Sequence, residues 1–327
     1  MKIAVVATNN CSVSAIYGVL DVFYAANYCM EQRYGKNHTD KLQCEIVTYD
    51  NKPCIGYNGV SIKPTATMQT LMPDLIVVAS SVELVILCCQ EHMAIEGIDA
   101  ISTWLNGCHR QGTAIASFCT GSFVLAQSGL LAGKVATTHW RSAELFKRAF
   151  PHIQLNSEEL LVDNGSIICS GGSMSYIDLS LYLIEREVSR EIASDTAKLL
   201  VFDPVREKQS QYTSFSAQKD HNDQPILSAQ EWLESHFKEK IVIDDIAARV
   251  ALTPRTFKRR FKQATQETPL SYLQRIRIEY AKGKLERSTQ SINNIMWSSG
   301  YEDLSSFRQL FKRYTGLTPK EYRYKFA

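Results

Sequence analysis

The sequence predicts an α/β domain built on a parallel sheet, followed by an all-α domain with two helix-turn-helix units. Two observations support this division. Through residues 1–205, short apolar runs alternate with amphipathic helical stretches, which is typical of a parallel α/β sheet. From residue 228 onward the apolar residues recur with helical spacing, and strand signals are absent from the sequence.

The composition fits a folded chain of two domains. Its 327 residues are about twice the usual size of one domain, and 45% apolar with 21% charged residues is ordinary globular usage. The most apolar run, 75–89, is interrupted by Ser80, Ser81 and Glu83, which makes it too short and too polar to span a bilayer. The N-terminus has no secretory signal pattern. We expect a soluble, cytoplasmic protein that does not bind membranes.

The nine cysteines do not form a disulfide or metal pattern. Their number is odd, and no C-x-x-C pair occurs. Most of them lie in apolar runs, where a free thiol packs as a small hydrophobic group. The spacing predicts a reduced protein without a structural metal, and we expect no cofactor. The cysteines stand at positions 11, 29, 44, 54, 88, 89, 108, 119 and 169.

Four short buried strands are predicted in the first domain. They span residues 2–8, 44–50, 74–79 and 113–118, and amphipathic stretches such as 14–28 and 98–109 separate them. This alternation favours strands that run parallel and are connected by helices.

The fourth predicted strand carries the most informative motif. It ends at Phe118 and is followed by Cys119-Thr120-Gly121-Ser122 and an amphipathic helix that ends near Gly129. A cysteine between a buried strand and a glycine-started helix is the arrangement of a nucleophile elbow. There the thiol lies on a strained turn near a helix N-terminus, which lowers its pKa. The spacing alone leaves two interpretations open, a reactive thiol and a cysteine that only packs.

Charge divides the chain. Residues 1–225 carry 17 Lys and Arg against 23 Asp and Glu, a net of −6, whereas residues 226–327 carry 19 against 11, a net of +8. An acidic part joined to a basic part suggests that only the second seeks a polyanion, although a solvated basic surface would give the same count. Next to this boundary, residues 206–225 are polar, weakly periodic and closed by a proline, so we predict an interdomain linker there.

The second domain contains an internal repeat. Phe257, Phe261 and Tyr272 recur 50 residues later as Phe307, Phe311 and Tyr322. Each copy has the pattern of a short helix, a turn and a second helix that begins at a cap, which is Thr253 followed by a proline in the first copy and Asp303 in the second. A helical solenoid needs at least about three copies. Two helix-turn-helix units therefore explain the repeat better.

The second helix of each copy has a polar face rich in hydrogen-bond donors. The phenylalanines form the inward stripe, and the outward positions recur at i, i+3, i+4 and i+7. Arg and Lys bind guanine edges or phosphates, and Ser and Gln hydrogen-bond to bases. The predicted DNA-binding residues are Arg255, Lys258, Arg259, Lys262, Ser305, Arg308, Gln309 and Lys312.

These residues resemble a known family. The runs IDDIAARVALTPRTFKRRFK (243–262) and SSGYEDLSSFRQLFKRYTGLTPKEYR (298–323) are similar to the DNA-binding domain of AraC/XylS-type transcription regulators. The resemblance implies two helix-turn-helix units joined by a long helix at about 269–286, with each recognition helix in one of two successive major-groove segments. It places at the base-facing positions Arg255, Lys258 and Arg259, then Ser305, Arg308 and Gln309.

The first domain resembles a second family. Cys119 at the elbow, the later segment Thr137-Thr138-His139, and the runs GVLDVF (18–23) and GGSMSYID (171–178) are similar to the PfpI-like, class I glutamine-amidotransferase-like superfamily, in the GlxA-type branch fused to AraC domains. The resemblance implies a flavodoxin-like parallel sheet between helices. It places Asp21 where the enzymes keep an acidic residue beside the cysteine, and His139 as the nearby imidazole. Protease-like members have His directly after the nucleophile, whereas this chain has Thr120, which argues against peptidase activity.

Two functions from different classes follow from these features. The first is a ligand-responsive, sequence-specific transcription regulator that binds double-stranded promoter DNA and is not an enzyme. The alternative is a cysteine-dependent hydratase or amidase with an appended interaction domain. Paired basic recognition helices favour the regulator, because an enzyme has no need of them. Its predicted ligand-binding residues are Asp21, Cys119, Thr120 and His139.

The resemblance adds expectations about partners. It favours an activator, which would act with RNA polymerase, and a homodimer formed through the α/β domain. By analogy with regulators of this type, the small-molecule effector would be an amine or an amino-acid-related metabolite.

Overall fold

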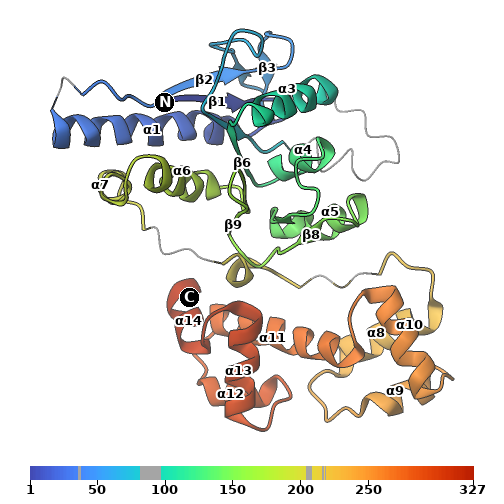
Figure 1. The fold of residues 1–327 in the computed structure, drawn as a ribbon. Helices are drawn as coiled ribbons and strands as arrows, with labels where there is room; N and C mark the ends of the chain where they lie inside the picture. Colours follow the sequence, from blue (N-terminus) through green and yellow to red (C-terminus); the bar gives the residue numbers. More distant parts are fainter. Residues whose placement is uncertain (36–37, 82–96, 204–207, 216, 218) are drawn as a thin grey trace. The chain divides into compact units, whose positions relative to one another are not determined.

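A computed structural model describes residues 1–35, 38–81, 97–203, 208–215, 217 and 219–327. The chain forms two compact units, Met1–Gln209 and Ser210–Ala327 (Figure 1). Among the helices of these ranges, none is long and apolar enough to cross a membrane. From residue 82 on, the apolar run 75–89 lies outside the described residues, and so do Cys88 and Cys89.

The first unit is built on a six-stranded sheet with the order β2-β1-β5-β6-β10-β9. The neighbouring strands are parallel except for β10 and β9. The five parallel strands follow the flavodoxin-like order 2-1-3-4-5, so the predicted fold class is confirmed. The strands of this sheet are β1 (Lys2–Val6), β2 (Gln43–Val47), β5 (Leu75–Val78), β6 (Ala114–Phe118), β9 (Leu161–Asp163) and β10 (Ile167–Ser170); β3 (Cys54–Ile55) pairs with β4 (Ser61–Ile62), and β7 (Val135–Ala136) with β8 (Gln154–Leu155).

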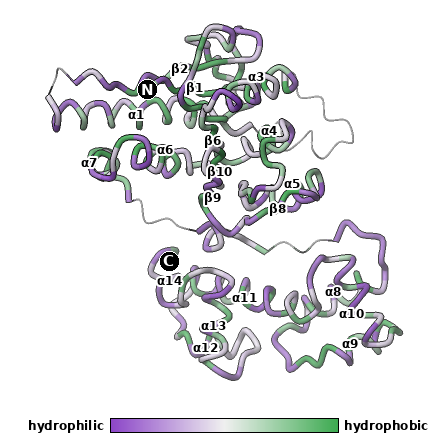
Figure 2. Tube along the Cα trace, viewed as in Figure 1, coloured by the Kyte–Doolittle hydropathy of each residue, from purple (hydrophilic) through white to green (hydrophobic). Residues whose placement is uncertain are grey.

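Helices cover both faces of this sheet. Ile3 and Val5 of β1 pack toward α1, α6 and α7, whereas Ala4 and Val6 pack toward α3, α4 and α5. Successive side chains of a strand point to opposite faces, so a strand covered on both sides must be apolar throughout. Figure 2 shows this as hydrophobic colour along the central strands. The helices of this unit are α1 (Val13–Tyr34), α3 (Ile98–Arg110), α4 (Gly121–Gln127), α5 (Ala143–Ala149), α6 (Ser175–Glu187) and α7 (Arg190–Leu199).

The four predicted strands are present, but the sheet has two more. β9 and β10 form an antiparallel pair at one edge. A turn joins them, in which Gly165 has a left-handed φ of +82° and its N–H bonds to Asp163. The tripeptide Asp-Asn-Gly at 163–165 is typical of a hairpin turn and was the signal in the sequence for this strand pair. The flanking runs of three and four residues were too short for their apolar pattern to stand out.

The second unit is all helical, and its two halves repeat the same packing. Phe261 lies edge-on to Tyr272 with 5.3 Å between the ring centroids, and Phe311 lies edge-on to Tyr322 at 5.4 Å. The tyrosine hydroxyls each donate to a glutamate. The offset of 50 therefore marks one structural unit used twice. The helices are α8 (Gln224–His236), α9 (Ile243–Arg249), α10 (Pro254–Thr265), α11 (Pro269–Arg287), α12 (Ile292–Ser298), α13 (Leu304–Thr315) and α14 (Pro319–Phe326).

The helix starts follow the predicted capping. The Thr253 side chain accepts from the Thr256 N–H at the start of α10, and the Asp303 carboxylate accepts from the Ser306 N–H at the start of α13. The turn before each helix contains one left-handed residue, Ala251 in the first copy and Gly300 in the second. Both recognition helices thus begin at a side-chain cap, which satisfies backbone donors that the helix itself leaves open.

Part of the predicted linker 206–225 is packed. Residues 208–215, which we call the strap, include Gln209, only 1% exposed in the first unit, and Phe215, whose ring lies 5.3 Å from that of Tyr272 in the second. α8 begins at Gln224, inside the predicted linker, because the Asp223 carboxylate caps it. A polar run without periodicity predicts an exposed linker, and the partners of these side chains appear only in the folded chain.

Gly121 provides a test of how α4 packs on the sheet. A Cβ at this position would lie 2.4 Å from the carbonyl oxygen of Val78, a backbone atom that cannot move alone. We expect Gly121→Ala to lower the free energy of unfolding of the first unit by about 1–3 kcal/mol, as overpacking does. Urea denaturation measures it. Gly107→Ala in α3, where a Cβ meets nothing within 4 Å, is the matched control and should be neutral or stabilising by up to about 1 kcal/mol. Equal stability of the two variants would contradict the packing argument.

Candidate functional site

Cys119 lies on a strained turn between β6 and α4. Its φ of +55° is in the left-handed region, which costs a non-glycine residue about 1–3 kcal/mol. The surrounding backbone holds it there. The Cys119 N–H donates to the Ser170 carbonyl at 2.7 Å, and the Cys119 carbonyl accepts from the Thr138 hydroxyl at 3.1 Å. This is the predicted elbow, with strain located at the cysteine.

The Cys119 thiol is held in its protonated form. It is 6% exposed, and burial raises its pKa, although contacts to Ser173 and Thr120 act in the opposite direction. Its side-chain partner is the Ser173 hydroxyl, 3.8 Å from Sγ, and a hydroxyl is not a base that could take the proton. The thiolate, not the thiol, is the nucleophile. The elbow therefore has the shape of a catalytic site without an activated thiol.

The Thr120 hydroxyl forms two hydrogen bonds with backbone groups. It donates to the Ser81 carbonyl at 2.8 Å and accepts from the Ser81 N–H at 3.0 Å. Both bonds join the elbow to the carboxyl end of β5. The side chain therefore holds the elbow against the segment that follows β5.

His139 directly follows Thr138, whose hydroxyl bonds to the Cys119 carbonyl, but its imidazole has other partners. Its Nδ1 accepts from the Arg141 N–H at 3.1 Å, and its ring stacks on Trp140 at 5.7 Å. Burial and the Arg141 charge lower its pKa, so the imidazole is neutral at pH 7. Between these described residues, no hydrogen bond joins the imidazole to Cys119. A cysteine–histidine pair is therefore not formed in this arrangement.

Asp21 is an exposed residue of α1, which begins at Val13. Its charge acts on Tyr176, whose pKa is raised first by burial and then by Asp21. None of the hydrogen bonds among the described residues connects Asp21 with the other three predicted ligand residues. The structure brings Cys119, Thr120 and the His139 segment together, and Asp21 is connected to this region only through its charge on Tyr176.

Sequence reasoning did not single out two residues that touch the elbow, Ser173 and Thr138. Ser173 follows a glycine pair that the family resemblance had marked, and Thr138 directly precedes His139. Both residues therefore lie inside or beside motifs on which the family resemblance rests. Neither residue has a periodicity or spacing that indicates where its hydroxyl points.

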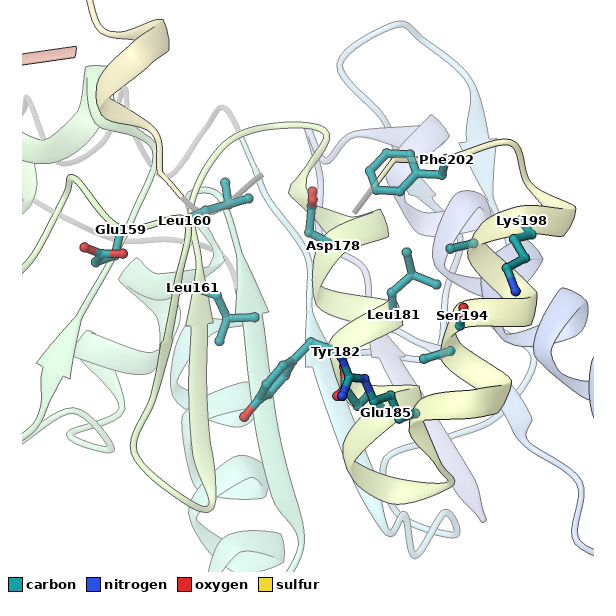
Figure 3. A pocket seen from close by; sticks show the side chains of 13 residues that line it. Glu159, Leu160, Leu161, Asp178, Leu181, Tyr182, Glu185, Ser194, Lys198 and Phe202 are labelled. Carbon is teal, nitrogen blue, oxygen red and sulfur yellow. The ribbon is translucent and has the colours of Figure 1, made fainter. Parts of the chain in front are cut away.

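A separate groove of about 710 Å³ lies in the first unit. Figure 3 shows Leu160 and Leu161 on one side and residues of α6 and α7, including Leu181 and Lys198, on the other. It contains none of the predicted ligand residues. Tyr182 in its wall donates a hydrogen bond to Asp163, which ties α6 to β9.

The predicted DNA-binding residues all lie on exposed surfaces of α10 and α13. Phe257 and Phe261 are fully buried beneath the first set, as are Phe307 and Phe311 beneath the second. Each helix therefore turns its phenylalanines inward and its donors outward, as the sequence predicts. The exposed residues are Arg255, Lys258, Arg259 and Lys262 on α10, and Ser305, Arg308, Gln309 and Lys312 on α13.

Two cations of α10 have partners within the protein. Lys258 pairs with Asp244 of α9 at 2.7 Å, and both side chains are more than half exposed. An exposed pair contributes at most about 1 kcal/mol, so a phosphate can displace the carboxylate. Arg260 binds both oxygens of Asp223, the N-cap of α8, at 2.9 and 2.7 Å. Lys258 is thus available to a polyanion, whereas Arg260 stabilises the fold.

Comparison with known families decides the identity of both parts. The DJ-1/PfpI family model matches residues 2–186, more than half of the chain. The chain belongs to the DJ-1/PfpI family. A helix-turn-helix domain model matches residues 246–325. This chain is therefore a DJ-1/PfpI protein that also carries the AraC-type DNA-binding domain recognised from its sequence.

Curated relatives share both parts. The HTH-type transcriptional regulator CdhR of Pseudomonas aeruginosa is 24% identical over 88% of this chain and 83% of its own length. The HTH-type transcriptional regulator GlxA of Rhizobium meliloti is 27% identical over 68% of this chain and 69% of its own. In a crystal structure of an AraC family transcriptional regulator from Pseudomonas putida, 98% of the chain aligns with 61% of this one, with a TM-score of 0.50 and 16% identity, which supports the fold alone.

The comparisons favour a DNA-binding regulator over an enzyme. The relatives that span most of this DJ-1/PfpI chain are transcriptional regulators. The geometry agrees, because the Cys119 thiol contacts no base among the described residues and burial raises its pKa, so it is not ionised as a nucleophile must be.

The protonation state of Cys119 has a measurable consequence. We expect iodoacetamide to modify it at pH 7.5 at least about tenfold more slowly than glutathione, because a raised pKa lowers the thiolate fraction and burial restricts access. The rate should keep rising above pH 9. Peptide mass spectrometry follows the site, and urea-unfolded protein is the control in which every thiol reacts. Fast labelling with a plateau near neutral pH would show an activated nucleophile.

Proposed function

We propose that this regulator changes its DNA binding in response to a small polar metabolite that binds at the Cys119 elbow. The observation that carries the proposal is that one chain contains both a catalytic-type elbow with an unactivated thiol and a duplicated donor-rich helix surface. An enzyme would need the thiol ionised. A sensor needs only a shaped, polar crevice whose occupation alters the fold.

The DNA-binding surface suits two successive segments of one groove. α10 and α13 are connected through α11, whose 19 residues span about 28 Å. Successive major-groove segments on one face of a duplex lie about 34 Å apart. We propose that α10 and α13 each enter one segment. The base-facing residues would be Arg255, Lys258, Arg259, Ser305, Arg308 and Gln309, with Lys262 and Lys312 nearer the phosphates.

The effector site that we propose is the crevice at the carboxyl ends of β5 and β6, where flavodoxin-like sheets bind ligands. Its walls would be Cys119, Thr120 and the segment of His139. An amine or amino-acid-related metabolite fits this chemistry, since backbone N–H groups at the elbow suit a carboxylate and Asp21 is an exposed anion for the amine. The segment that contains Ser173 and Tyr176 would connect the elbow with Asp21. Ser173 contacts the Cys119 thiol, and burial and the charge of Asp21 raise the pKa of Tyr176.

The proposal extends to assembly and output. A homodimer through the α/β unit would double the number of phosphate contacts and let an effector change the spacing of the two DNA-binding halves. Activation through contact with RNA polymerase is the output favoured by the family resemblance. Both steps use surfaces outside the elbow and the recognition helices.

The basic unit should bind duplex DNA on its own. We expect residues 210–327 to bind and residues 1–209 not to bind, following the compact units and the charge division. Each phosphate contact releases counterions, so with six or more contacts the affinity should fall by roughly 10³-fold or more between 50 and 200 mM salt. Fluorescence anisotropy at several salt concentrations measures this. Binding by the first unit, or none by the second, would contradict the assignment.

Two neighbouring cations should affect recognition differently. Arg259→Ala should relax base preference, with a loss of about 1–3 kcal/mol of discrimination at one position. Lys262→Ala should weaken all sequences evenly and reduce the salt slope by about one contact. Selection from a randomised duplex pool compares the profiles. Lys240→Ala, an exposed cation outside both recognition helices, is the control. An unchanged profile for Arg259→Ala would remove it from the base-reading set.

The effector crevice can be tested by substitution. Thermal-shift screening of the full chain against a metabolite library identifies a binder, since binding raises apparent stability by mass action. With that compound, Cys119→Ser should keep the response in a reporter assay, because the thiol is not used as a nucleophile. Asp21→Ala should abolish the response while basal DNA binding remains. Loss of response in Cys119→Ser together with consumption of the compound would favour the hydratase or amidase alternative. A full response in Asp21→Ala would place the amine contact elsewhere.

A further inference from the structure

The strap contains one residue that is fixed to the elbow and others that are fixed to the DNA-binding unit. Gln209 is the last residue of the first compact unit, and Ser210 is the first of the second. Gln209 is 1% exposed although it lies in a polar segment. A buried amide is costly unless its donors and acceptor are satisfied, so the contacts of this side chain show what holds the strap.

The Gln209 amide clamps the segment around His139. Its Nε2 donates to the Thr138 carbonyl at 2.9 Å, and its Oε1 accepts from the Trp140 N–H at 3.2 Å. These two backbone groups flank His139. The Thr138 hydroxyl in turn donates to the Cys119 carbonyl. One side-chain amide therefore positions the His139 segment and, through Thr138, reaches the strained turn.

Further contacts of Gln209 join the same region. Nε2 also faces the Glu159 carbonyl at 3.1 Å, and the Gln209 N–H donates to the Glu158 carbonyl at 2.7 Å. The amide lies against Gly171, where a Cβ would be 1.9 Å from Nε2. Gly171 comes two residues before Ser173, which contacts the Cys119 thiol. Gln209 is thus bonded or packed against both segments that close the elbow.

The residues after Gln209 are fixed to both halves of the DNA-binding unit. Gln211 accepts from Lys325 of α14 at 2.9 Å. The Thr213 carbonyl accepts from Lys282 of α11, which is only 7% exposed and is paired with Glu279. These contacts fix the first part of the strap to the second helix-turn-helix unit and to the connecting helix.

The end of the strap reaches the first helix-turn-helix unit. The Phe215 N–H donates to Glu279 at 3.2 Å, and its ring lies edge-on to Tyr272 at 5.3 Å. Tyr272 packs edge-on against Phe261, the buried residue beneath the α10 recognition surface. The strap therefore contacts the supports of both recognition helices within six residues of Gln209.

We propose that Gln209 is the positioning residue that couples the elbow to the recognition helices, by holding the His139 segment on one side and the strap on the other. Occupation of the elbow would shift the Thr138–Trp140 segment, and with it Gln209 and the strap bonded to α11 and α14. This inference rests on the proposed function. Coupling between two sites is reciprocal, so DNA binding must act back on the elbow through the same residue.

Reciprocity allows a test without a known effector. The probe is a duplex that the full chain selects from a randomised pool, and the readout is hydrogen exchange of the peptide 116–124 with and without it. In the unmodified protein, we expect DNA to change the exchange rate there by about fivefold or more, the lower end of usual coupling factors.

Two variants remove the relay in different ways. A Gly-Ser insertion between Gln209 and Ser210 keeps every contact of both residues but adds about 7 Å of slack. Gln209→Ala removes the clamp itself. In each we expect the effect of DNA on peptide 116–124 to fall below about 1.5-fold, with DNA affinity within about twofold of the unmodified protein. The same insertion between Asn58 and Gly59, in the exposed β3–β4 turn, is the control and should leave the coupling intact.

The insertion variant keeps the test decisive if Gln209→Ala fails to fold. Undiminished coupling in the insertion variant, or no effect of DNA on the elbow in the unmodified protein, would overturn the relay. Because affinity is measured separately, failure of the regulator function would appear as absent DNA binding, and would overturn the relay with it. Failure of the relay alone would appear as normal DNA binding with unchanged coupling in the variants.

Discussion

The left-handed backbone at Cys119 is the constraint around which the first unit is arranged. A non-glycine residue adopts this conformation only when its surroundings over-determine it. The sheet provides this through the hydrogen bond from Cys119 to Ser170, and the Thr138 hydroxyl secures the carbonyl on the other side. Gly121 then allows α4 to start directly against β5. The tight turn brings three separate segments of the chain to one point.

The same turn distinguishes this elbow from a catalytic one and agrees with the sensing role proposed above. In a catalytic elbow the strained cysteine is ionised and a base lies within reach. Here burial keeps the thiol protonated, its neighbour is a serine hydroxyl, and the imidazole is engaged with backbone and with Trp140. The geometry that presents a nucleophile is intact, while the electrostatics that would activate it are not.

The second unit uses a common frame for two different surfaces. Matching threonines, phenylalanines and tyrosines build nearly the same aromatic support beneath α10 and α13. The outward residues differ, with three cations in the first turns of α10 and Ser305, Arg308 and Gln309 on α13. Because the support is buried and the surface is exposed, the chain can vary the recognition residues without altering the frame. The contacts of the strap reach this frame and leave the recognition surfaces open.

Much of this protein was determined by local sequence alone. A strand covered on both faces must be apolar throughout, so β1, β5 and β6 were recognisable, and the repeat at an offset of 50 predicted the aromatic frame and the exposed faces of both recognition helices. The elbow was predicted because strand, cysteine and glycine are adjacent in the chain. The short strands β9 and β10 were not, since three or four residues carry too little periodicity. Tertiary structure alone decided that Ser173 meets the thiol, that Thr138 holds the Cys119 carbonyl, and that Gln209 is buried in a polar segment. Those outcomes depend on which distant backbone groups converge on a side chain, and neither hydrophobic period nor local propensity encodes that convergence.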